Sequence, residues 1–460
     1  MIGDIAYEAI AKARPVLDEL SRNIWENPEG PYKEVKACQW TAQVLRDAGF
    51  DVEVGIAGIP TAIKATWGHG HPVMGFLGEY DSLPGLSQKL CTHPDPVVSG
   101  GWGHGCGHNL LGTAHVGGVL GLKAEMEADH LEGTIVFYGC PAEEVLTGKP
   151  FMARGGAFDC LDWMIAFHPS TVNSVFQGVA VGVDSVKFHY KGKSAHAGGA
   201  PHLGRSALDA LELTNVGVQY LREHVTDDVR IHYITLEGGT APNVVPDKAS
   251  SWYMVRALTR EGVDSVYERL LKVARGAAMM TETEVEVEFL GGCYPTMQNK
   301  CFGRVLQDCM HKIPWEKFTE EDKQFAREVN EATPESAERA RKRMNLPADT
   351  QLFEGVAPLE AHNSSGSFDV GDVEYIVPGI MFGTTCNALG SANHSWQTTA
   401  CVGSSIGEKG MVNAAKVMAL FALTVLHDPS IYEEAKAEFD AEMAGRTYHC
   451  PIPDGVPLPL

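Results

Sequence analysis

Basic residues are scarce in this sequence relative to acidic ones. The 460 residues include 37 lysines and arginines against 59 aspartates and glutamates, which gives a formal net charge of -22. A chain with this charge repels polyanions at long range, so nucleic acid and acidic membrane surfaces are excluded as expected partners. The net charge by itself indicates nothing about the substrate.

Long apolar runs and closely paired cysteines are also missing. No uncharged apolar run reaches the roughly 18 residues of a transmembrane helix, so we expect no membrane span. The N-terminal MIGDIAYEAIAKARP is acidic where a signal peptide is basic, and it lacks an apolar core, so we expect no secretion. The eleven cysteines are scattered along the chain, which disfavours a disulfide framework and predicts a cytoplasmic protein.

Glycine, in contrast, is abundant. There are 49 glycines, and they concentrate in segments such as GWGHGCGHNLLG rather than in a periodic repeat. Glycine is the residue used where a backbone turns sharply or approaches another group closely. The hydrophobic content of 44% and the charged content of 21% are those of a folded soluble chain.

Short apolar runs separated by helical patterns organise most of the chain. The runs at 73–77, 134–139, 163–167 and 375–382 are typical of buried strands, and 110–127 is typical of a helix between two of them. Strands that alternate with helices predict an α/β fold with a mostly parallel sheet.

The order of elements is different between residues 184 and 291. The pattern there predicts a strand at 186–190, a helix at 206–224, strands at 229–236 and 249–257, a helix at 263–279 and a strand at 284–289. This β-α-β-β-α-β order is the ferredoxin-like plan and is long enough for its own core. We therefore predict a domain at 184–291 inserted into a larger one formed by 1–183 and 292–460. The role of the charged segment at 314–360 stays open, with a solvated helix surface as the simplest interpretation.

Polar side chains follow the predicted strands at the points where ligand sites of open α/β sheets lie. They occur in four motifs: Glu79 and Asp81 in GEYDSLPG, Cys106 and His108 in GHGCGHNLLG, Glu143 and Glu144 in GCPAEE, and His168 in AFHPS.

Each motif alone has an ordinary interpretation, because a free cysteine is often a small buried hydrophobe and a pair of glutamates is often a solvated helix turn. Together, a thiolate, imidazoles and carboxylates at one sheet edge match the ligands of zinc or a comparable divalent metal. Neighbouring residues of an extended chain point to opposite sides, so of Glu143 and Glu144 one can bind metal while the other acts as a base.

The order of these motifs, followed by GKSAHAGGAPHLGRSALDA, GGTAPNVVPDKA and a late NHSWQ, resembles the aminoacylase and carboxypeptidase superfamily of dinuclear metallohydrolases. The Cys-x-His loop is similar to that of the amidohydrolase branch, which includes hydrolases of amino-acid conjugates. The resemblance covers nearly the whole chain. It implies that 1–183 and 292–460 form the catalytic domain and that 184–291 is a lid and dimerisation domain.

The resemblance also implies two divalent metal ions per chain, zinc or manganese. The implied ligands are Cys106, His108, Glu144, His168 and His394. Glu143 becomes the general base, and Asp81 orients a ligand imidazole. Glu79 is not counted as a ligand, and whether Cys106 bridges the metals stays open. Asn109 stands where this branch commonly has aspartate, which leaves the charge of the site open.

The resemblance assigns further roles to the inserted domain. His196 in AHAGG would reach the active site of a partner subunit and donate to the oxyanion, while Asn243 and Arg256 would bind substrate. The alternative interpretations are that His196 is a surface histidine, Asn243 caps a turn and Arg256 is a surface cation. An arginine fork binds a carboxylate with two hydrogen bonds, so Arg256 suits a substrate with a free carboxylate. A homodimer through 184–291 is implied, and a heteromer with a related subunit is possible.

The expected activity is hydrolysis of the amide of an N-acyl or N-aroyl amino acid, with p-aminobenzoyl-glutamate as the first candidate substrate. A water held between two divalent ions has a lowered pKa, and Glu143 would take its proton and pass it to the leaving nitrogen. The alternatives are a dipeptidase or another conjugate hydrolase of the same family, a catalytically silent partner subunit, and a redox or metal-storage protein built on Cys106. The last is disfavoured because no second cysteine lies close by in the sequence.

Overall fold

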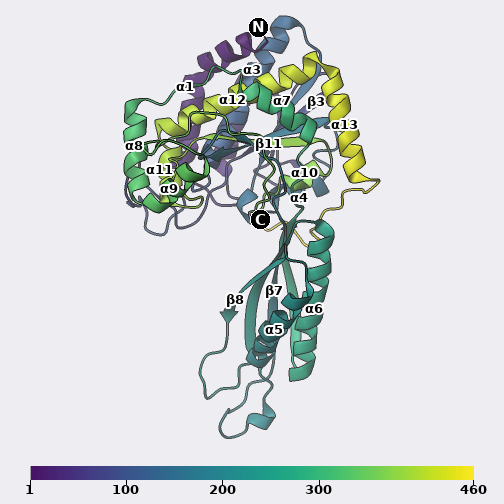
Figure 1. The fold of residues 1–460 in the computed structure, drawn as a ribbon. Coiled ribbons are helices and arrows are strands. Elements are labelled where there is room, and N and C mark those ends of the chain that lie inside the picture. Colours follow the sequence, from purple (N-terminus) through teal and green to yellow (C-terminus); the bar gives the residue numbers. More distant parts are fainter. Residues whose placement is uncertain (1) are drawn as a thin grey trace.

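Two sheets, each with its own helices, organise the chain (Figure 1). The structure is a computed structural model that describes residues 2–460. The larger lobe contains a seven-stranded sheet in the order β1-β2-β4-β3-β5-β11-β6. Its strands are β1 (Asp51–Val54), β2 (Ile63–His69), β3 (Val73–Glu79), β4 (Gly133–Cys140), β5 (Trp163–Ser170), β6 (Ser174–Val175) and β11 (Gly379–Thr385).

The four central strands, β4, β3, β5 and β11, are parallel to one another, which confirms the predicted α/β class. Antiparallel strands extend the sheet at both edges: β1 and β2 on one side, β6 on the other. The sequence interpretation missed these edge strands because they are short or partly exposed and lack a continuous apolar run. The strand expected at 375–382 begins only at Gly379, because residues 371–374 form a helical turn and Pro378 precedes the strand.

Helices cover both faces of this sheet. They are α1 (Asp4–Glu26), α2 (Val35–Asp47), α3 (His108–Asp129), α4 (Gly148–Arg154), α7 (Lys300–Met310), α8 (Glu320–Glu331), α9 (Pro334–Arg343), α10 (Gly371–Glu374), α11 (Trp396–Val402), α12 (Ser405–His427) and α13 (Pro429–Met443). Helix α3 packs against α1, α12 and β3, and its first twelve residues, 108–119, are all buried. An apolar surface on every side is the pattern of a central core helix.

Helix α12 is, among residues 2–460, the one helix long and apolar enough to cross a membrane by length and composition. Within its most apolar stretch of 18 residues, 83% is buried inside the protein. That burial comes from packing on neighbours such as α3 and α1, as in the core helix of a folded domain.

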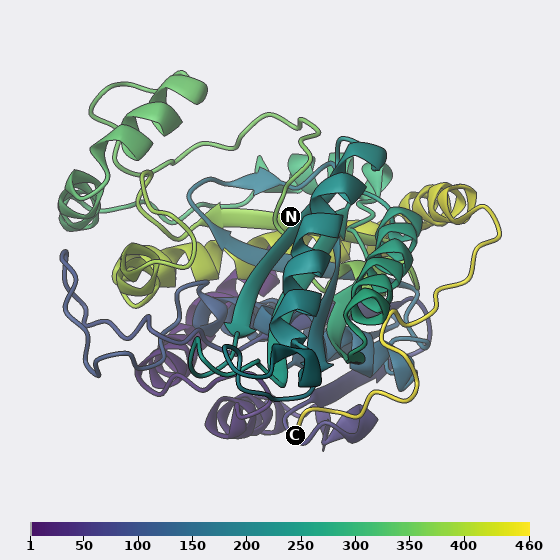
Figure 2. The same cartoon turned by 90° about the horizontal axis from the view of Figure 1, so that it is seen from below.

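The smaller lobe has the predicted β-α-β-β-α-β order. Its elements are β7 (Gly182–Lys191), α5 (Ala207–Leu221), β8 (Arg230–Glu237), β9 (Lys248–Ala257), α6 (Arg260–Thr281) and β10 (Glu284–Cys293). They form an antiparallel sheet in the order β10-β7-β9-β8. Both helices pack side by side on the same face, where Tyr253 and Val255 are buried (Figure 2). The opposite face carries partly exposed side chains.

Gly112 lets α3 lie unusually close to β3. A Cβ atom at this position would meet the carbonyl oxygen of Glu79 at 2.5 Å. Any larger residue would push the helix away from the strand, and His108 is only one turn earlier on the same helix.

We predict that Gly112→Ala lowers the free energy of unfolding by about 1–3 kcal/mol, because the extra methyl group overpacks the contact between helix and strand. The matched control is Gly276→Ala in the middle of α6, where a Cβ would meet nothing within 4 Å. That change should raise the free energy of unfolding by about 0.5–1 kcal/mol through helix propensity. Denaturant unfolding of both variants measures the difference, and equal effects would contradict the close-approach argument.

Candidate metal centre

Three neighbouring parallel strands deliver side chains to the same edge of the larger sheet. Glu79 is the last residue of β3, Glu143 and Glu144 follow the end of β4, and His168 lies in β5. The carboxyl ends of parallel strands meet at one edge, which is where α/β sheets bind ligands.

The glycine-rich loop brings Cys106 and His108 to this edge from the start of α3. Gly107 caps the helix with φ 85°, a left-handed conformation that favours glycine. A Cβ at Gly107 would also press on Pro169 and Val402 at 3.0 Å. The turn therefore depends on glycine both for its backbone angle and for space.

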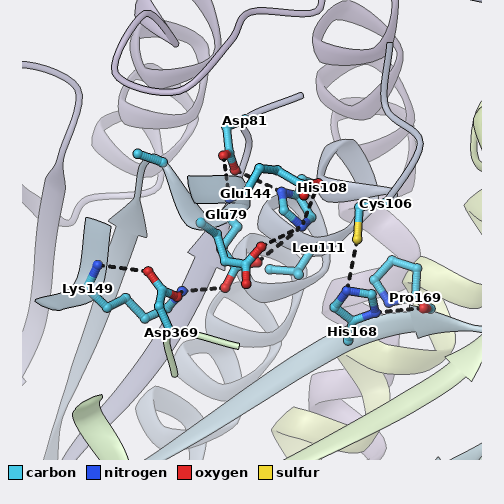
Figure 3. Close-up of polar contacts among 12 residues, drawn as sticks. Glu79, Asp81, Cys106, His108, Leu111, Glu144, Lys149, His168, Pro169 and Asp369 are labelled. Carbon is cyan, nitrogen blue, oxygen red and sulfur yellow. Dashed lines mark hydrogen bonds and ion pairs between the residues drawn. The ribbon is translucent and has the colours of Figure 1, made fainter. Parts of the chain in front are cut away.

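The imidazole of His108 is fully buried at the centre of the cluster (Figure 3). Its Nδ1 atom lies 2.8 Å from Oδ1 of Asp81. Its Nε2 atom faces carboxylate oxygens of Glu79 at 3.4 Å, Glu143 at 3.7 Å and Glu144 at 3.8 Å. Glu143 and Glu144 belong to a 3₁₀ turn and not to the extended segment expected from the sequence, so both carboxylates face this atom. The hydrogen bond to Asp81 fixes the ring so that Nε2 points at the glutamates.

A second group forms around Cys106. Its Sγ atom lies 3.2 Å from Nε2 of His168, whose Nδ1 is 2.8 Å from the Pro169 carbonyl (Figure 3). Nε2 of His394 lies 3.5 Å from Oε2 of Glu144. The His394 backbone N–H donates to the carbonyl of Gly105, which ties the late NHSWQ motif to the glycine-rich loop.

All five sequence-predicted ligands thus lie in one cluster. Three sets of donor atoms lie within 4.8 Å of one another there: Cys106 with His108 and His168, Cys106 with Glu144 and His394, and Glu79 with His108 and Glu143. Cys106 belongs to two of these sets.

The donor atoms suit divalent metal ions. Nε2 of His108 and Oε1 of Glu144 are buried, and neither has a hydrogen-bond partner within residues 2–460. Buried polar atoms without partners are rare in folded proteins and indicate an ion or ligand in the functional state. Thiolate, imidazole and carboxylate together form a ligand set that zinc accepts.

Burial and mutual repulsion shift the titration of this cluster. Burial, followed by the charges of Glu79 and Asp369, raises the pKa of Glu143 well above its ordinary value. Burial also raises the pKa of Glu144 to about 7, and it lowers that of His168 to about 4. A cation bound among these side chains would favour the ionised carboxylates and the neutral imidazole.

The sequence interpretation missed Lys149. This lysine is completely buried, and its Nζ lies 2.5 Å from both Oε1 of Glu79 and Oδ1 of Asp369. Burial opposes its charge, but Asp369 and Glu79 hold its pKa well above the ordinary value. No local signal reveals it, because its partners are 70 and 220 residues away in the sequence. Lys149 occupies one oxygen of Glu79, while the other oxygen lies 3.4 Å from Nε2 of His108.

Asn109 turns away from the cluster. Its Nδ2 donates to Oγ of Ser21 in α1 and to the Val402 carbonyl at the end of α11, each at 3.1 Å. Asn109, which stands where the amidohydrolase branch commonly has aspartate, therefore links α3 to α1 and α11.

The three residues of the smaller lobe that were predicted to contact substrate lie at different ends of that lobe. Strand β7 runs outward from the junction, so the loops 192–206 and 238–247, which contain His196 and Asn243, lie at the far end of this lobe (Figure 1). There Nδ1 of His196 accepts backbone N–H groups of Gly198 and Gly199, which leaves Nε2 as a donor. Neither His196 nor Asn243 therefore lies near the donor cluster of its own chain.

Arg256 lies at the near end. Its Nη1 donates to Oγ of Ser367 at 3.1 Å and to the carbonyl of Ser365 at 3.3 Å. The next residue along that loop, Phe368, packs edge-on against the His168 ring, with ring centroids 5.3 Å apart. Of the three residues, only Arg256 neighbours the cluster of its own chain.

Comparison with known proteins identifies the family of the chain. Residues 180–279 match the peptidase dimerisation domain of the M20 family. The chain is 37% identical to one of the subunits of the p-aminobenzoyl-glutamate hydrolase of Escherichia coli K12, over 98% of both chains. It is 30% identical to Xaa-Arg dipeptidase of Mus musculus, over 95% of this chain and 92% of the relative.

A solved structure shares the fold. The dinuclear metal-binding M20 peptidase of Bacillus subtilis matches with a TM-score of 0.59 at 18% identity, over 91% of this chain and 99% of that one. With 37% identity to a full-length relative and the characteristic second domain in place, the chain belongs to the M20 family of metal-dependent hydrolases.

Proposed function

We propose that this protein is a dinuclear metal amidohydrolase that cleaves N-acyl or N-aroyl amino acids, with p-aminobenzoyl-glutamate as the leading substrate and p-aminobenzoate and glutamate as its products. One observation carries the proposal: five donor side chains converge beside the buried carboxyl group of Glu143. The choice of substrate is supported by the 37% identical relative, which is named for that hydrolysis.

The proposed metal ligands are Cys106, His108, Glu144, His168 and His394. Cys106 and His108 each belong to two of the donor sets, and a thiolate, unlike an imidazole nitrogen, could contact two ions, so Cys106 would be the candidate shared ligand. When bound, two zinc or manganese ions supply a water molecule of lowered pKa and polarise the substrate carbonyl. Asp81 keeps the His108 ring oriented through their 2.8 Å contact.

Glu143 is proposed as the general base. It is buried, and its carboxylate faces the same space as Nε2 of His108. In this role it takes a proton from the attacking water and returns it to the nitrogen of the leaving amino acid.

Residues 184–291 are proposed as a lid and dimerisation domain. Strand β8 is an edge strand with exposed Ile234 and Leu236, and an exposed apolar edge favours pairing with another chain. A partner's domain could then bring its His196 and Asn243 to this chain's cluster, with His196 donating to the oxyanion. Arg256 of the same chain would bind the substrate carboxylate.

We favour a homodimer in the cytoplasm. All eleven cysteines are free, as expected in a reducing compartment. A heteromer with a related subunit is the alternative assembly.

A second candidate activity is that of a dipeptidase, supported by 30% identity to the mouse Xaa-Arg dipeptidase. A catalytically silent subunit is disfavoured because Glu143 and all five donor side chains are present.

The first prediction concerns Glu143. Protein loaded with zinc or manganese should release p-aminobenzoate from p-aminobenzoyl-glutamate, and Glu143→Gln should lower kcat by about 10²–10⁴-fold, since general bases contribute that much. Product release by chromatography measures the rates, and elemental analysis should show an unchanged metal content in the variant. Normal turnover by Glu143→Gln would refute the mechanism.

The second prediction concerns Cys106. Because Cys106 belongs to two donor sets, Cys106→Ala should bind fewer metal ions per chain than wild type in elemental analysis. Cys140→Ala is the matched control, since Cys140 is also buried at this sheet edge but belongs to none of the donor sets of residues 2–460. An undiminished metal content in Cys106→Ala would remove this thiol from the site.

The third prediction tests the contribution of the partner subunit. His196→Ala and Glu143→Gln should each be inactive, yet co-refolding them in equal amounts should restore about a quarter of wild-type activity, because half of the random dimers then hold one intact site. His202→Ala, an exposed histidine of the same lobe, should stay active. No recovery by the mixture, with mixed dimers verified by mass spectrometry, would exclude a shared site.

A further inference from the structure

Two pockets of different polarity adjoin the metal centre. The first has a volume of about 380 Å³ and lies between the loop that begins at Glu144 and the helix-free face of the smaller sheet. The second has a volume of about 290 Å³ and includes His168 in its wall. Since Glu144 and His168 both belong to the donor cluster, both pockets adjoin a substrate held at the centre.

The first pocket is apolar. Val145 and Leu146 contribute one wall, and Trp252, Met254 and Leu290 contribute the other. Among residues 2–460, Glu144 is the one acidic or basic side chain that lines it. Its volume falls within the roughly 300–1,000 Å³ of small-molecule sites.

Strand β9 positions the two main apolar side chains of this pocket. Successive residues of a strand point to opposite faces. Tyr253 and Val255 are buried under α5 and α6, so Trp252 and Met254 project from the other face, toward the larger lobe.

The indole of Trp252 is held in place. Its Nε1 donates to Oγ of Ser185 on the neighbouring strand at 2.8 Å, and Nζ of Lys187 lies 5.9 Å from the ring centroid. A fixed aromatic face of this kind stacks favourably on a flat ring.

The second pocket is more polar than the first, although Phe176, Phe368 and Met381 also line it. Ser364, Thr296, Gln298 and Asn393 line it together with His168. Ser364 precedes Ser365, whose carbonyl accepts from Arg256. The Nη2 atom of Arg256 lies 3.9 Å from Sδ of Met254, so the guanidinium lies between the loop of the second pocket and the edge of the first.

From this division we infer the orientation and class of the substrate, on the basis of the proposed amidohydrolase function: a flat aromatic acyl group binds in the pocket of Trp252 and Met254, and the carboxylate-bearing amino acid binds on the His168 side. Trp252 is then a specificity-determining residue that distinguishes N-aroyl from small N-acyl amino acids. A small acetyl group fills little of the apolar pocket and gains little from it.

The test compares N-benzoyl-glutamate with N-acetyl-glutamate, which share the same leaving amino acid. In metal-loaded protein, Trp252→Ala should lower kcat/KM for the benzoyl substrate by about 10- to 100-fold, and that for the acetyl substrate by less than about threefold. Met254→Ala should shift the ratio in the same direction. Met280→Ala, which removes a methionine that is 71% exposed at the end of α6, is the control and should leave the ratio unchanged.

A binding measurement separates this inference from the proposed reaction. In the Glu143→Gln background, calorimetry should show tighter binding of N-benzoyl-glutamate than of N-acetyl-glutamate, and Trp252→Ala should abolish that preference. If neither compound is hydrolysed but the preference and its loss are observed, the proposed reaction fails while the assignment of the pocket stands. If Trp252→Ala and Met254→Ala leave both the rate ratio and the binding preference intact, the assignment is wrong. Trp252→Leu replaces Trp252→Ala if thermal melting shows that the latter is unfolded.

Discussion

Repulsion among buried carboxylates is the constraint on which the rest of the site depends. Five acidic side chains with almost no exposure gather at one edge of the larger sheet: Glu79, Asp81, Glu143, Glu144 and Asp369. Burying ionised groups without compensation costs far more than a single domain can supply. The cluster can fold and ionise only if cations are placed among these groups, and the chain provides one, Lys149. The imidazole of His108 adds a second positive charge only while its Nε2 carries a proton, and that atom must lose the proton to bind a metal ion. Divalent metal ions would neutralise the remainder.

This requirement divides the carboxylates into groups with different roles. Glu79 and Asp369 share Lys149, which makes a buried ion cluster that removing any one member would unbalance. Asp81 instead binds Nδ1 of His108 and orients it. The two glutamates after β4 have no lysine or arginine partner among residues 2–460 and instead face the imidazoles of His108 and His394, so they are the ones proposed for metal binding and catalysis.

The two lobes supply different parts of one site. The larger lobe presents the donor cluster, and the near end of the smaller lobe adds Arg256 and the Trp252 wall. The far end of the smaller lobe holds His196 and Asn243, which the fold of a single chain keeps away from that cluster. A site completed by a second chain would make dimerisation part of catalysis. The difference in polarity between the two adjoining pockets would then align a substrate that is apolar at one end and anionic at the other.

The sequence by itself determined the α/β class, the inserted β-α-β-β-α-β unit and the convergence of Cys106, His108, Glu144 and His168. Apolar periodicity and strand ends are local signals, and the ends of parallel strands must meet at one edge. Only the tertiary structure decided the edge strands β1, β2 and β6, the burial of Lys149 between Glu79 and Asp369, and the apolar pocket beneath Trp252. Those features rest on contacts between residues far apart in the chain, and no local pattern specifies which distant charge or apolar wall a folded side chain will meet.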